Sequence, residues 1–305
     1  MDSKSGSLAR GFALNAIDEV TYECSEELAG MYKLSPFVWR DRGGFELLLR
    51  VVNYSDDAST KVARIHSGFS SDGLHFDLEP IAVIAPGPDI PGATDSGGCE
   101  DPTVAIVEGR YYVYYSGWNE HIKRGELLLA SGPTLQHLEK RGIALASSKT
   151  LRNPKEATIV RVADGTWRLF FEFAEDDRSK IGLASSPNVD GPWTVLDPLF
   201  AARAGRWDDW HLSTGPIFGE SNLPVMFYNG ATRDAHWRIG WVVFDPLYCR
   251  VLARSEEPVI DPGPRRYPED TDLAFAASAV EEDSTVRLYY SIADRHVMRA
   301  TLRRA

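Results

Sequence analysis

The sequence lacks the features of several common protein classes. Its three cysteines, Cys24, Cys99 and Cys249, lie far apart and outside any CxxC or Cys/His pattern, which argues against a disulfide framework and a zinc site. The net charge is −11 and no basic stripe is present, so a nucleic-acid or anionic-membrane binder is not indicated. No apolar run approaches the ~18 residues of a membrane-spanning helix, and residues 1–13 have no signal-peptide pattern. We therefore expect a cytoplasmic protein.

Helical periodicity is also nearly absent. No long segment keeps apolar residues at i, i+3 and i+4, and the loops are rich in Gly, Pro, Asp and Ser. Instead, one unit recurs five times: an apolar strand, a turn, a second strand rich in aromatic or aliphatic residues, a polar loop and a third strand. The units begin at Pro36, Thr103, Ala157, Gly215 and Ala276, and the last four starts are 54, 58 and 61 residues apart.

A period of nearly sixty residues is typical of one blade of a β-propeller. The alternatives are a β-sandwich, which rarely repeats such a period five times, and a β-helix, whose coils are much shorter. We therefore predict an all-β chain with a five-bladed β-propeller as its single domain over residues 32–305. Residues 1–31 are expected to be an N-terminal arm or closing segment. In a propeller the residues just before each inner strand point into a central funnel.

The most distinctive stretch is Gly97-Gly98-Cys99-Glu100-Asp101-Pro102-Thr103-Val104. Gly and Pro constrain the backbone where a loop becomes a strand, so Glu100 and Asp101 are presented at the mouth of a strand. On its own, a Glu-Asp pair in a loop is more often a solvated turn than a site. Its interpretation therefore depends on the other strand mouths.

Three further units bring carboxylates to the equivalent place. They contribute Arg152-Asn153-Pro154-Lys155-Glu156, Trp207-Asp208-Asp209-Trp210-His211 and Tyr267-Pro268-Glu269-Asp270-Thr271-Asp272. Glycoside cleavage needs one carboxylic acid to protonate the leaving oxygen and a second carboxylate or another nucleophile on the opposite face of the sugar. Acids on different blades can stand ~6.5–9.5 Å apart, which leaves room for water or phosphate in an inverting reaction. The pattern predicts an inverting carbohydrate-active site.

Aromatic residues at these strand mouths fit the same interpretation. Trp207, Trp210 and Tyr267 can stack on the apolar faces of sugars. The two tryptophans suit packing between blades equally well. Glu156 is either a second acid or a salt-bridge partner of Lys155, and the sequence leaves both roles open.

Several short motifs follow one another in a specific order. They are Leu48-Leu49-Arg50-Val51, Ser71-Asp72-Gly73, Glu100-Asp101-Pro102, Trp207-Asp208 with Thr214-Gly215-Pro216, and Leu288-Tyr289-Tyr290-Ser291-Ile292-Ala293-Asp294. This order resembles glycoside hydrolase family 130, which comprises β-mannoside phosphorylases and β-1,2-mannosidases on a five-bladed β-propeller. The resemblance covers roughly residues 35–302.

The resemblance implies an inverting enzyme that acts on β-linked mannosides or related oligosaccharides. Asp101 matches the family's general acid, thought to act through a sugar hydroxyl. Asp208 matches the carboxylate that serves as base for water in hydrolytic members. In phosphorolytic members inorganic phosphate is the nucleophile, and the cationic candidates to hold it are Arg50, Arg152, Lys155 and His211. The candidate substrate contacts are Arg50, Glu100, Glu156, Trp207, Trp210 and Asp272.

Two positions depart from the family pattern. Thr103 stands where phosphorylases usually carry an arginine, so one bidentate contact to phosphate or substrate is missing. Asp208 stands where the family has glutamate, which shortens the base by one methylene and shifts it by ~1 Å. Hydrolysis and phosphorolysis therefore both stay open, with a slight preference for hydrolysis. Neither reaction needs a metal or an organic cofactor.

Two other functions remain as alternatives. One is a carbohydrate-binding propeller that kept the aromatic residues and lost the chemistry. The other is an arabinanase-like or fructosidase-like glycosidase, which also places three carboxylates on separate blades. The sugar linkage, the leaving group and the oligomeric state are not indicated by the sequence. A homo-oligomer in which residues 1–31 reach a neighbouring subunit stays open.

Overall fold

A computed structural model describes residues 11–304 except 42, 56, 58, 59, 89–91, 220–222, 265–267 and 269. The described chain consists almost entirely of strands, turns and loops. Its helical segments are the short α1 (Glu26–Ala29) and a 3-10 turn at Leu135–His137. The expected all-β class is therefore confirmed. No helix in this part of the chain is long and apolar enough to cross a membrane.

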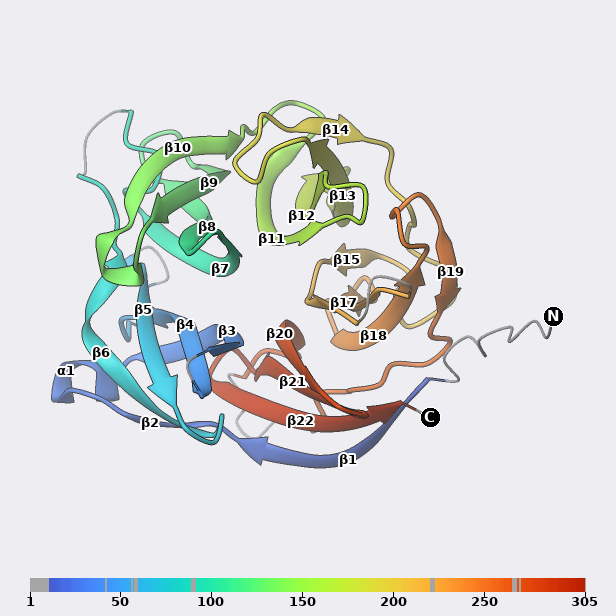
Figure 1. Cartoon of the computed structure of the whole chain (residues 1–305), viewed down its shortest axis with the longest axis horizontal. Coiled ribbons are helices and arrows are strands. Elements are labelled where there is room, and N and C mark those ends of the chain that lie inside the picture. Colours follow the sequence, from blue (N-terminus) through green and yellow to red (C-terminus); the bar gives the residue numbers. More distant parts are fainter. Residues whose placement is uncertain are drawn as a thin grey trace.

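The strands form four hydrogen-bonded sheets, which Figure 1 shows around a common centre. The largest sheet has nine strands: β2 (Thr21–Glu23), β3 (Tyr32–Asp41), β4 (Gly44–Val52), β5 (Ala63–Ser70), β6 (His75–Ile84), β7 (Gly98–Val107), β8 (Arg110–Asn119), β9 (Arg124–Gly132) and β10 (Glu139–Leu145). Among the described residues, the strand pairing of β2–β6 is joined to that of β7–β10 at one position, where Ala63 of β5 pairs with Gly98 of β7. Each half is thus a nearly separate strand ladder, antiparallel except for the parallel pair β2 and β6.

Two sheets follow in the middle of the chain. One contains β11 (Arg152–Arg161), β12 (Trp167–Glu175), β13 (Arg178–Ser186) and β14 (Thr194–Leu196). The other contains β15 (His211–Ser213), β16 (Ile217–Phe218), β17 (Val225–Ala231), β18 (Trp237–Phe244) and β19 (Val251–Arg254). In the latter, β15 and β16 both pair with β17, because residues 214–216 interrupt what would otherwise be one inner strand.

The last sheet joins the two ends of the described chain (Figure 1). It contains β20 (Ala274–Glu282), β21 (Thr285–Ile292) and β22 (His296–Arg304), and its fourth strand is β1 (Phe12–Glu19). β1 pairs antiparallel with β22, so that Phe12 lies opposite Arg304. Part of the segment expected as an arm or closing segment thus supplies the edge strand of the C-terminal sheet.

The strands nearest the centre share an irregularity at the same level. Residue pairing shifts between Leu34 and Phe37 in β3, between Glu100 and Thr103 in β7, between Lys155 and Thr158 in β11 and between Ala276 and Ser278 in β20. Three of the bulged residues, Ser35, Asp101 and Glu156, have φ values of 49°, 50° and 50°. A left-handed backbone costs a non-glycine residue about 1 kcal/mol, and such bulges redirect side chains. These bulges therefore aim polar side chains at the centre.

Hydrogen bonds join each inner strand to the next. Ser278 donates to Pro36 O (2.7 Å), Ser35 to Asp101 Oδ1 (2.6 Å) and Thr158 to Gly215 O (2.9 Å), while Ser116 accepts from Glu156 N (3.3 Å) and Asn229 from Ala276 N (2.7 Å). These bonds link the central segments of all the sheets into one circuit. The polar backbone groups left free by the bulges are satisfied in this way.

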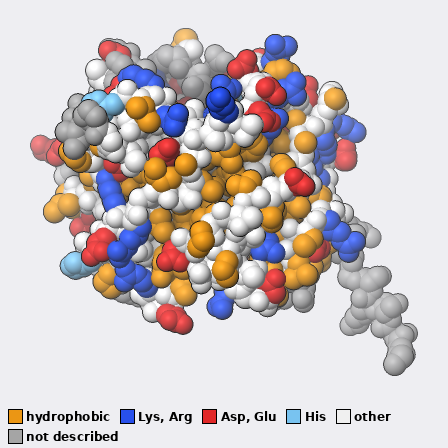
Figure 2. All heavy atoms as spheres, turned by 90° about the horizontal axis from the view of Figure 1, so that it is seen from above, with side chains coloured by type: hydrophobic (Ala, Val, Ile, Leu, Met, Phe, Trp, Pro, Cys, Tyr) orange, Lys and Arg blue, Asp and Glu red, His pale blue; other side chains and the backbone are white. Residues whose placement is uncertain are grey.

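Apolar burial follows the same arrangement. One buried cluster lies between β3–β5 and β7–β9, and others lie between β7–β9 and β11–β13, between β12–β13 and β17–β18, between β17–β18 and β20–β22, and between β3–β4 and β20–β22. Each cluster therefore fills the space between neighbouring sheets or half-sheets. On the face seen in Figure 2, basic and acidic side chains are interspersed, with no large region of one sign.

Candidate active site

Two carboxyl groups meet at the centre of the molecule. Asp101 and Glu156 occupy equivalent bulges on β7 and β11, and a hydrogen bond with the Glu156 side chain helps to lower the pKa of Asp101. Both line a central hollow of about 20 Å³, together with Ser35 of β3, Thr214 and Ala277 of β20. The side chain of Asp101 is 4% exposed. Carboxyls from two predicted strand mouths are thus brought into direct contact.

Arg50, on β4, holds the acidic motif of β7. Its Nη2 lies 2.7 Å from Glu100 Oε1, and its Nη1 lies 3.2 Å from Asp101 Oδ1. Burial opposes the charge on Arg50, but the carboxylates of Glu100 and Asp101 outweigh it and raise the pKa of the guanidinium. The planar guanidinium bridges two neighbouring carboxylates and so fixes their orientation.

The surroundings separate the protonation behaviour of the two central acids. Burial raises the pKa of Glu156 well above its usual range, and the negative charge of Asp101 adds to this effect. For Asp101, burial acts in the same direction, but Arg50, the Ser35 hydroxyl and Lys155 outweigh it and lower the pKa. These surroundings favour the ionised form of Asp101 and the protonated form of Glu156.

A second group of polar residues lies beside this pair, on β11, β12, β13 and β15. Glu172 Oε1 lies 3.4 Å from Lys155 Nζ and accepts a hydrogen bond from Ser179 Oγ at 2.8 Å. The backbone N–H of Ser179 donates to His211 Nδ1 at 3.1 Å, so the neutral ring carries its proton on Nε2. The charge of Glu172 raises the pKa of Lys155 against the opposing effect of burial, whereas burial lowers the pKa of His211. An ammonium and a neutral imidazole donor are thus brought together.

The aromatic candidate Trp210 is surrounded by cations. The guanidinium carbons of Arg178 and Arg233 lie 3.8 Å and 4.6 Å from its ring centroid, within cation–π range. His211 stacks on Trp237, with ring centroids 5.6 Å apart. The sequence pattern did not identify Arg178 or Trp237 as site residues. Both belong to the third strand of a unit, whereas the search was directed at strand mouths.

Comparison with known proteins identifies the family. The model of one family, described as beta-1,4-mannooligosaccharide phosphorylase, matches residues 36–304. The chain belongs to glycoside hydrolase family 130. The expected family is confirmed, and with it the expected enzyme class, a glycosidase or glycoside phosphorylase.

Individual family members are distant in sequence but close in fold. A 1,2-beta-oligomannan phosphorylase of Thermoanaerobacter sp. (strain X514) is 22% identical over 261 residues, which cover 83% of this chain and 84% of that protein. The beta-1,2-mannobiose phosphorylase structure from Listeria innocua is 20% identical with a TM-score of 0.75, over 97% of this chain and 92% of that one. A structure described with family 130 hydrolases of beta-1,2 mannosidic linkages in Candida mannan is 24% identical, with a TM-score of 0.74 over 89% and 84% of the two chains.

Asp208, the residue that matches the family's base, is not brought to the central pair. Its side chain is fully buried. Arg203 donates to both of its oxygens (3.1 and 3.0 Å), and Tyr228 (2.6 Å) and Arg254 (2.5 Å) donate to Oδ2. Trp207 stacks on the ring of Tyr228, with centroids 5.4 Å apart. In this family 130 chain Trp207 therefore packs on Tyr228, and Asp208 balances the charges of two arginines, Arg203 and Arg254.

The remaining predicted residues have varied surroundings. Asp272 Oδ2 lies 2.5 Å from His236 Nδ1, and the side chain of Arg152 is exposed at the start of β11. Tyr267 and Glu269 lie outside the described residues. Thr103, at the family's arginine position, is 3% exposed. Of the predicted phosphate-binding cations, the structure groups Lys155 and His211 around Glu172 and leaves Arg50 on the acidic motif.

Other residues near the site were not predicted. Ser35 donates a hydrogen bond to Asp101. Ser35-Pro36 in the first unit is a polar residue followed by proline, as is Asp101-Pro102 in the second unit. This shared pattern could have identified Ser35 from the sequence. Asp294 acts electrostatically on Arg50 and Glu100, and it is the last residue of the family motif that ends β21. Glu172 carried no comparable signal, because it lies within an apolar strand.

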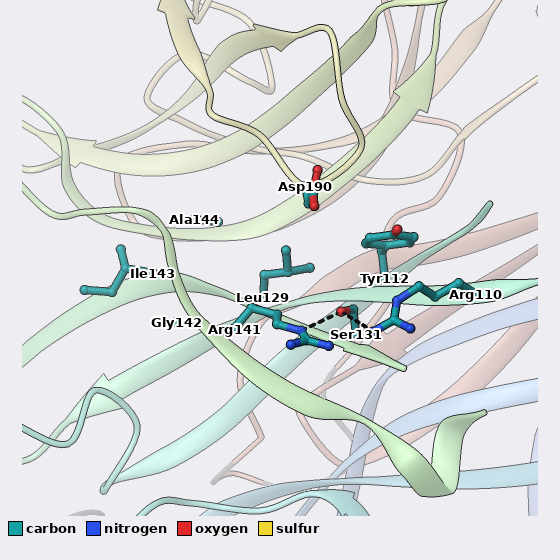
Figure 3. Close-up of a pocket in the computed structure, with 9 residues that line it drawn as sticks. All are labelled: Arg110, Tyr112, Leu129, Ser131, Arg141, Gly142, Ile143, Ala144 and Asp190. Atoms are coloured by element: carbon teal, nitrogen blue, oxygen red, sulfur yellow. Dashed lines mark hydrogen bonds between the residues drawn. The ribbon is translucent and has the colours of Figure 1, made fainter. Parts of the chain in front are cut away.

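A larger hollow of about 360 Å³ lies away from these residues (Figure 3). It is formed mainly by β8, β9 and β10, with Asp190 on the opposite side. Within it Arg110 and Arg141 both donate to the hydroxyl of Ser131, at 3.4 Å and 2.8 Å. It contains none of the predicted site residues. Across the described residues, no three His, Cys, Asp or Glu side chains are grouped so that they could hold a metal ion.

Proposed function

We propose that this chain is an inverting phosphorylase of β-linked mannosides. Asp101 is the general acid, and inorganic phosphate held by Lys155 and His211 is the nucleophile. The observation that carries this proposal is the grouping of the Lys155 ammonium and the His211 imidazole around Glu172, beside the central carboxyl pair. Both are donors, as an anionic nucleophile requires. The relatives named as beta-1,2-mannoside phosphorylases support the same substrate class.

The surroundings of Asp208 favour phosphate over water as the nucleophile. A hydrolase of the inverting type needs a carboxylate that contacts the attacking water. Asp208 is buried, and its oxygens accept hydrogen bonds from two arginines and a tyrosine. We therefore leave Asp208 out of the reacting groups. Phosphate needs no such base because it is already an anion at neutral pH.

The scaffold that we propose is a five-bladed β-propeller. The largest sheet divides into two units at a single residue pair, which gives five antiparallel units in all. Five apolar clusters fill the five junctions between these units, as blade packing requires. The central hydrogen-bond circuit agrees with this arrangement. In this propeller Asp101 and Glu156 would lie close to the central axis, and the oligosaccharide would bind in the funnel at their end of the axis.

Replacing Lys155 with methionine tests the phosphate site. Methionine keeps the length of the side chain and removes the charge, so we expect the KM for phosphate to rise about 10- to 100-fold, the equivalent of a charged hydrogen bond. The KM for the mannoside should change little. Lys180→Met is the matched control, because Lys180 pairs with Glu175 (2.5 Å) on the same sheet. Equal phosphate kinetics in both variants would contradict the assignment of Lys155.

Product analysis tests the function as a whole. The wild-type protein is incubated with β-1,2-linked and β-1,4-linked mannobiose, with and without inorganic phosphate. We expect mannose 1-phosphate to form only when phosphate is present. Free mannose formed at the same rate without phosphate would replace the proposal with hydrolysis. Lack of turnover of both substrates under both conditions would instead favour a carbohydrate-binding role.

A further inference from the structure

We propose that Glu156 stores the proton that Asp101 delivers to the leaving group, so that the two side chains act as one acid with a single shared proton. This inference rests on the proposed function, since it concerns how the general acid of that reaction obtains its proton. Glu156 acts through Asp101 and does not itself contact the reacting atoms. It is therefore a positioning residue in the strict sense, with an additional role as a proton reservoir.

The first argument is geometric. Both residues sit at the bulge of an inner strand, with matching φ values of 50°, on neighbouring strands that face the same hollow. Both carboxyl groups line this hollow, and a hydrogen bond with Glu156 helps to lower the pKa of Asp101; a bond between two carboxyl groups needs a proton on one of them. The backbone of Glu156 is held in place on both sides. Its N–H donates to Ser116, and its carbonyl accepts from the hydroxyl of Thr214.

The second argument is the local charge balance. The charged groups that act on the pair from the surrounding strands are Arg50, Glu100, Lys155 and Glu172, and Asp294 acts in turn on Arg50 and Glu100. With Asp101 and Glu156 included, carboxyl groups outnumber the two cations. Two adjacent carboxylates in a site with little water cannot both ionise readily, because their repulsion is strong there. One proton retained by the pair relieves this excess of negative charge.

The third argument concerns which member holds the proton. Ser35 and Arg50 contact Asp101 directly and stabilise its carboxylate form. A general acid that is ionised at rest cannot protonate a leaving group. It needs a neighbour that supplies the proton during the transfer, and Glu156, whose pKa is raised, lies beside it on the same hollow. The arrangement thus resolves the conflict between a stabilised Asp101 carboxylate and its role as an acid.

The proton and bond changes balance in this scheme. The bond between the anomeric carbon and the glycosidic oxygen breaks, and a bond forms between the anomeric carbon and an oxygen of HPO₄²⁻. The shared proton passes through Asp101 to the departing oxygen, which leaves both carboxyl groups ionised. The sugar phosphate forms as a monoanion and loses its remaining proton to solvent. A proton from solvent then protonates the pair again.

The variant Glu156→Gln provides the test. Glutamine keeps the size of the side chain and can still donate a hydrogen bond to Asp101, but it cannot transfer a proton. With β-1,2-mannobiose and phosphate we expect kcat to fall about 100-fold, the lower end of general-acid effects, with KM little changed. With 2,4-dinitrophenyl β-mannoside, whose leaving group needs no proton, kcat should fall less than about 5-fold, since only the acid step is impaired.

The pH dependence gives a second readout that does not need the aryl substrate. In the wild type, activity should fall at alkaline pH, as the raised pKa of Glu156 is passed and the pair loses its proton. In Glu156→Gln, Asp101 must hold the proton alone, and its pKa is lowered by Arg50 and Ser35. The alkaline limb should therefore move to lower pH. A merely structural role for Glu156 would leave the position of this limb unchanged.

Glu126→Gln is the matched control. Glu126 is a glutamate of β9 that is 6% exposed and whose pKa is also raised, mainly by burial, but it is not among the groups that act on the pair. It should change neither the leaving-group dependence nor the pH limb. Equal losses of Glu156→Gln on both substrates, or an unmoved limb, would overturn the inference. An inactive wild type on both mannobioses would instead overturn the proposed function.

Discussion

Replacing Asp101 with asparagine is expected to lower kcat/KM on β-linked mannobiose by about 10²- to 10⁴-fold, the range of a lost general acid. Asparagine tolerates the left-handed backbone at this position (φ 50°). Its side-chain oxygen can still accept from Ser35, which now donates at 2.6 Å. The fold should therefore survive while proton transfer is lost. Steady-state kinetics with the natural disaccharide, together with a thermal melt, would measure both.

Glu100→Gln is the natural comparison for that experiment. Glu100 stands next to Asp101 and shares the same arginine, at 2.7 Å from Arg50 Nη2. If its role is to orient the sugar, its loss should raise KM more than it lowers kcat. A variant Asp101→Asn with undiminished kcat would show that the general acid is another group. Glu156 would then be the first candidate.

Replacing Asp208 with asparagine is expected to lower the free energy of unfolding by about 3 kcal/mol, because it leaves a buried charge network without its anion. Arg203 and Arg254 would face each other across a neutral amide, and their side chains are only 22% and 10% exposed. Tyr228 would also lose its charged acceptor. Urea denaturation of the purified variant, followed by tryptophan fluorescence, would measure the change.

The exposed end of the same network provides a control. Glu256 lies 3.9 Å from Arg203 Nη1 and is 68% exposed, so Glu256→Gln should alter stability by less than about 0.5 kcal/mol. Activity separates the two interpretations of Asp208. Under our proposal, folded Asp208→Asn retains phosphorolysis. A variant that is as stable as the wild type but inactive would restore the catalytic base implied by the family motif.

The inner and middle strands of each unit could be located from the sequence, because they are buried and carry runs of apolar or aromatic residues. The expected unit starts Pro36, Thr103, Ala157 and Ala276 fall within β3, β7, β11 and β20. The outer strands were not separated from loops. β10 and β14 are exposed over most or all of their length, so they carry no apolar alternation by which they could be found.

Residues of the site were predictable where they lie in the segment just before an inner strand and their side chains face the centre of the molecule. Asp101, Lys155 and Glu156 are of this kind, and the structure groups them. The surroundings of Asp208 could not be deduced, because they depend on a residue far along the chain. Arg254, which donates to it, follows 46 residues later on an outer strand. No local pattern shows that such a cation will meet the carboxylate.

The strand pairing of β1 with β22 has a consequence for the order of assembly. During synthesis on the ribosome β1 emerges before the other described strands, whereas its hydrogen-bonding partner β22 follows all of them. The sheet of β20–β22 therefore cannot acquire its edge strand until β22 has been made, and pairing over so large a separation is slow. In the finished protein most side chains of β1 face solvent. Leu14 and Ile17 of β1 are each 45% exposed even after pairing, so an unpaired β1 adds little further apolar surface while it waits for its partner.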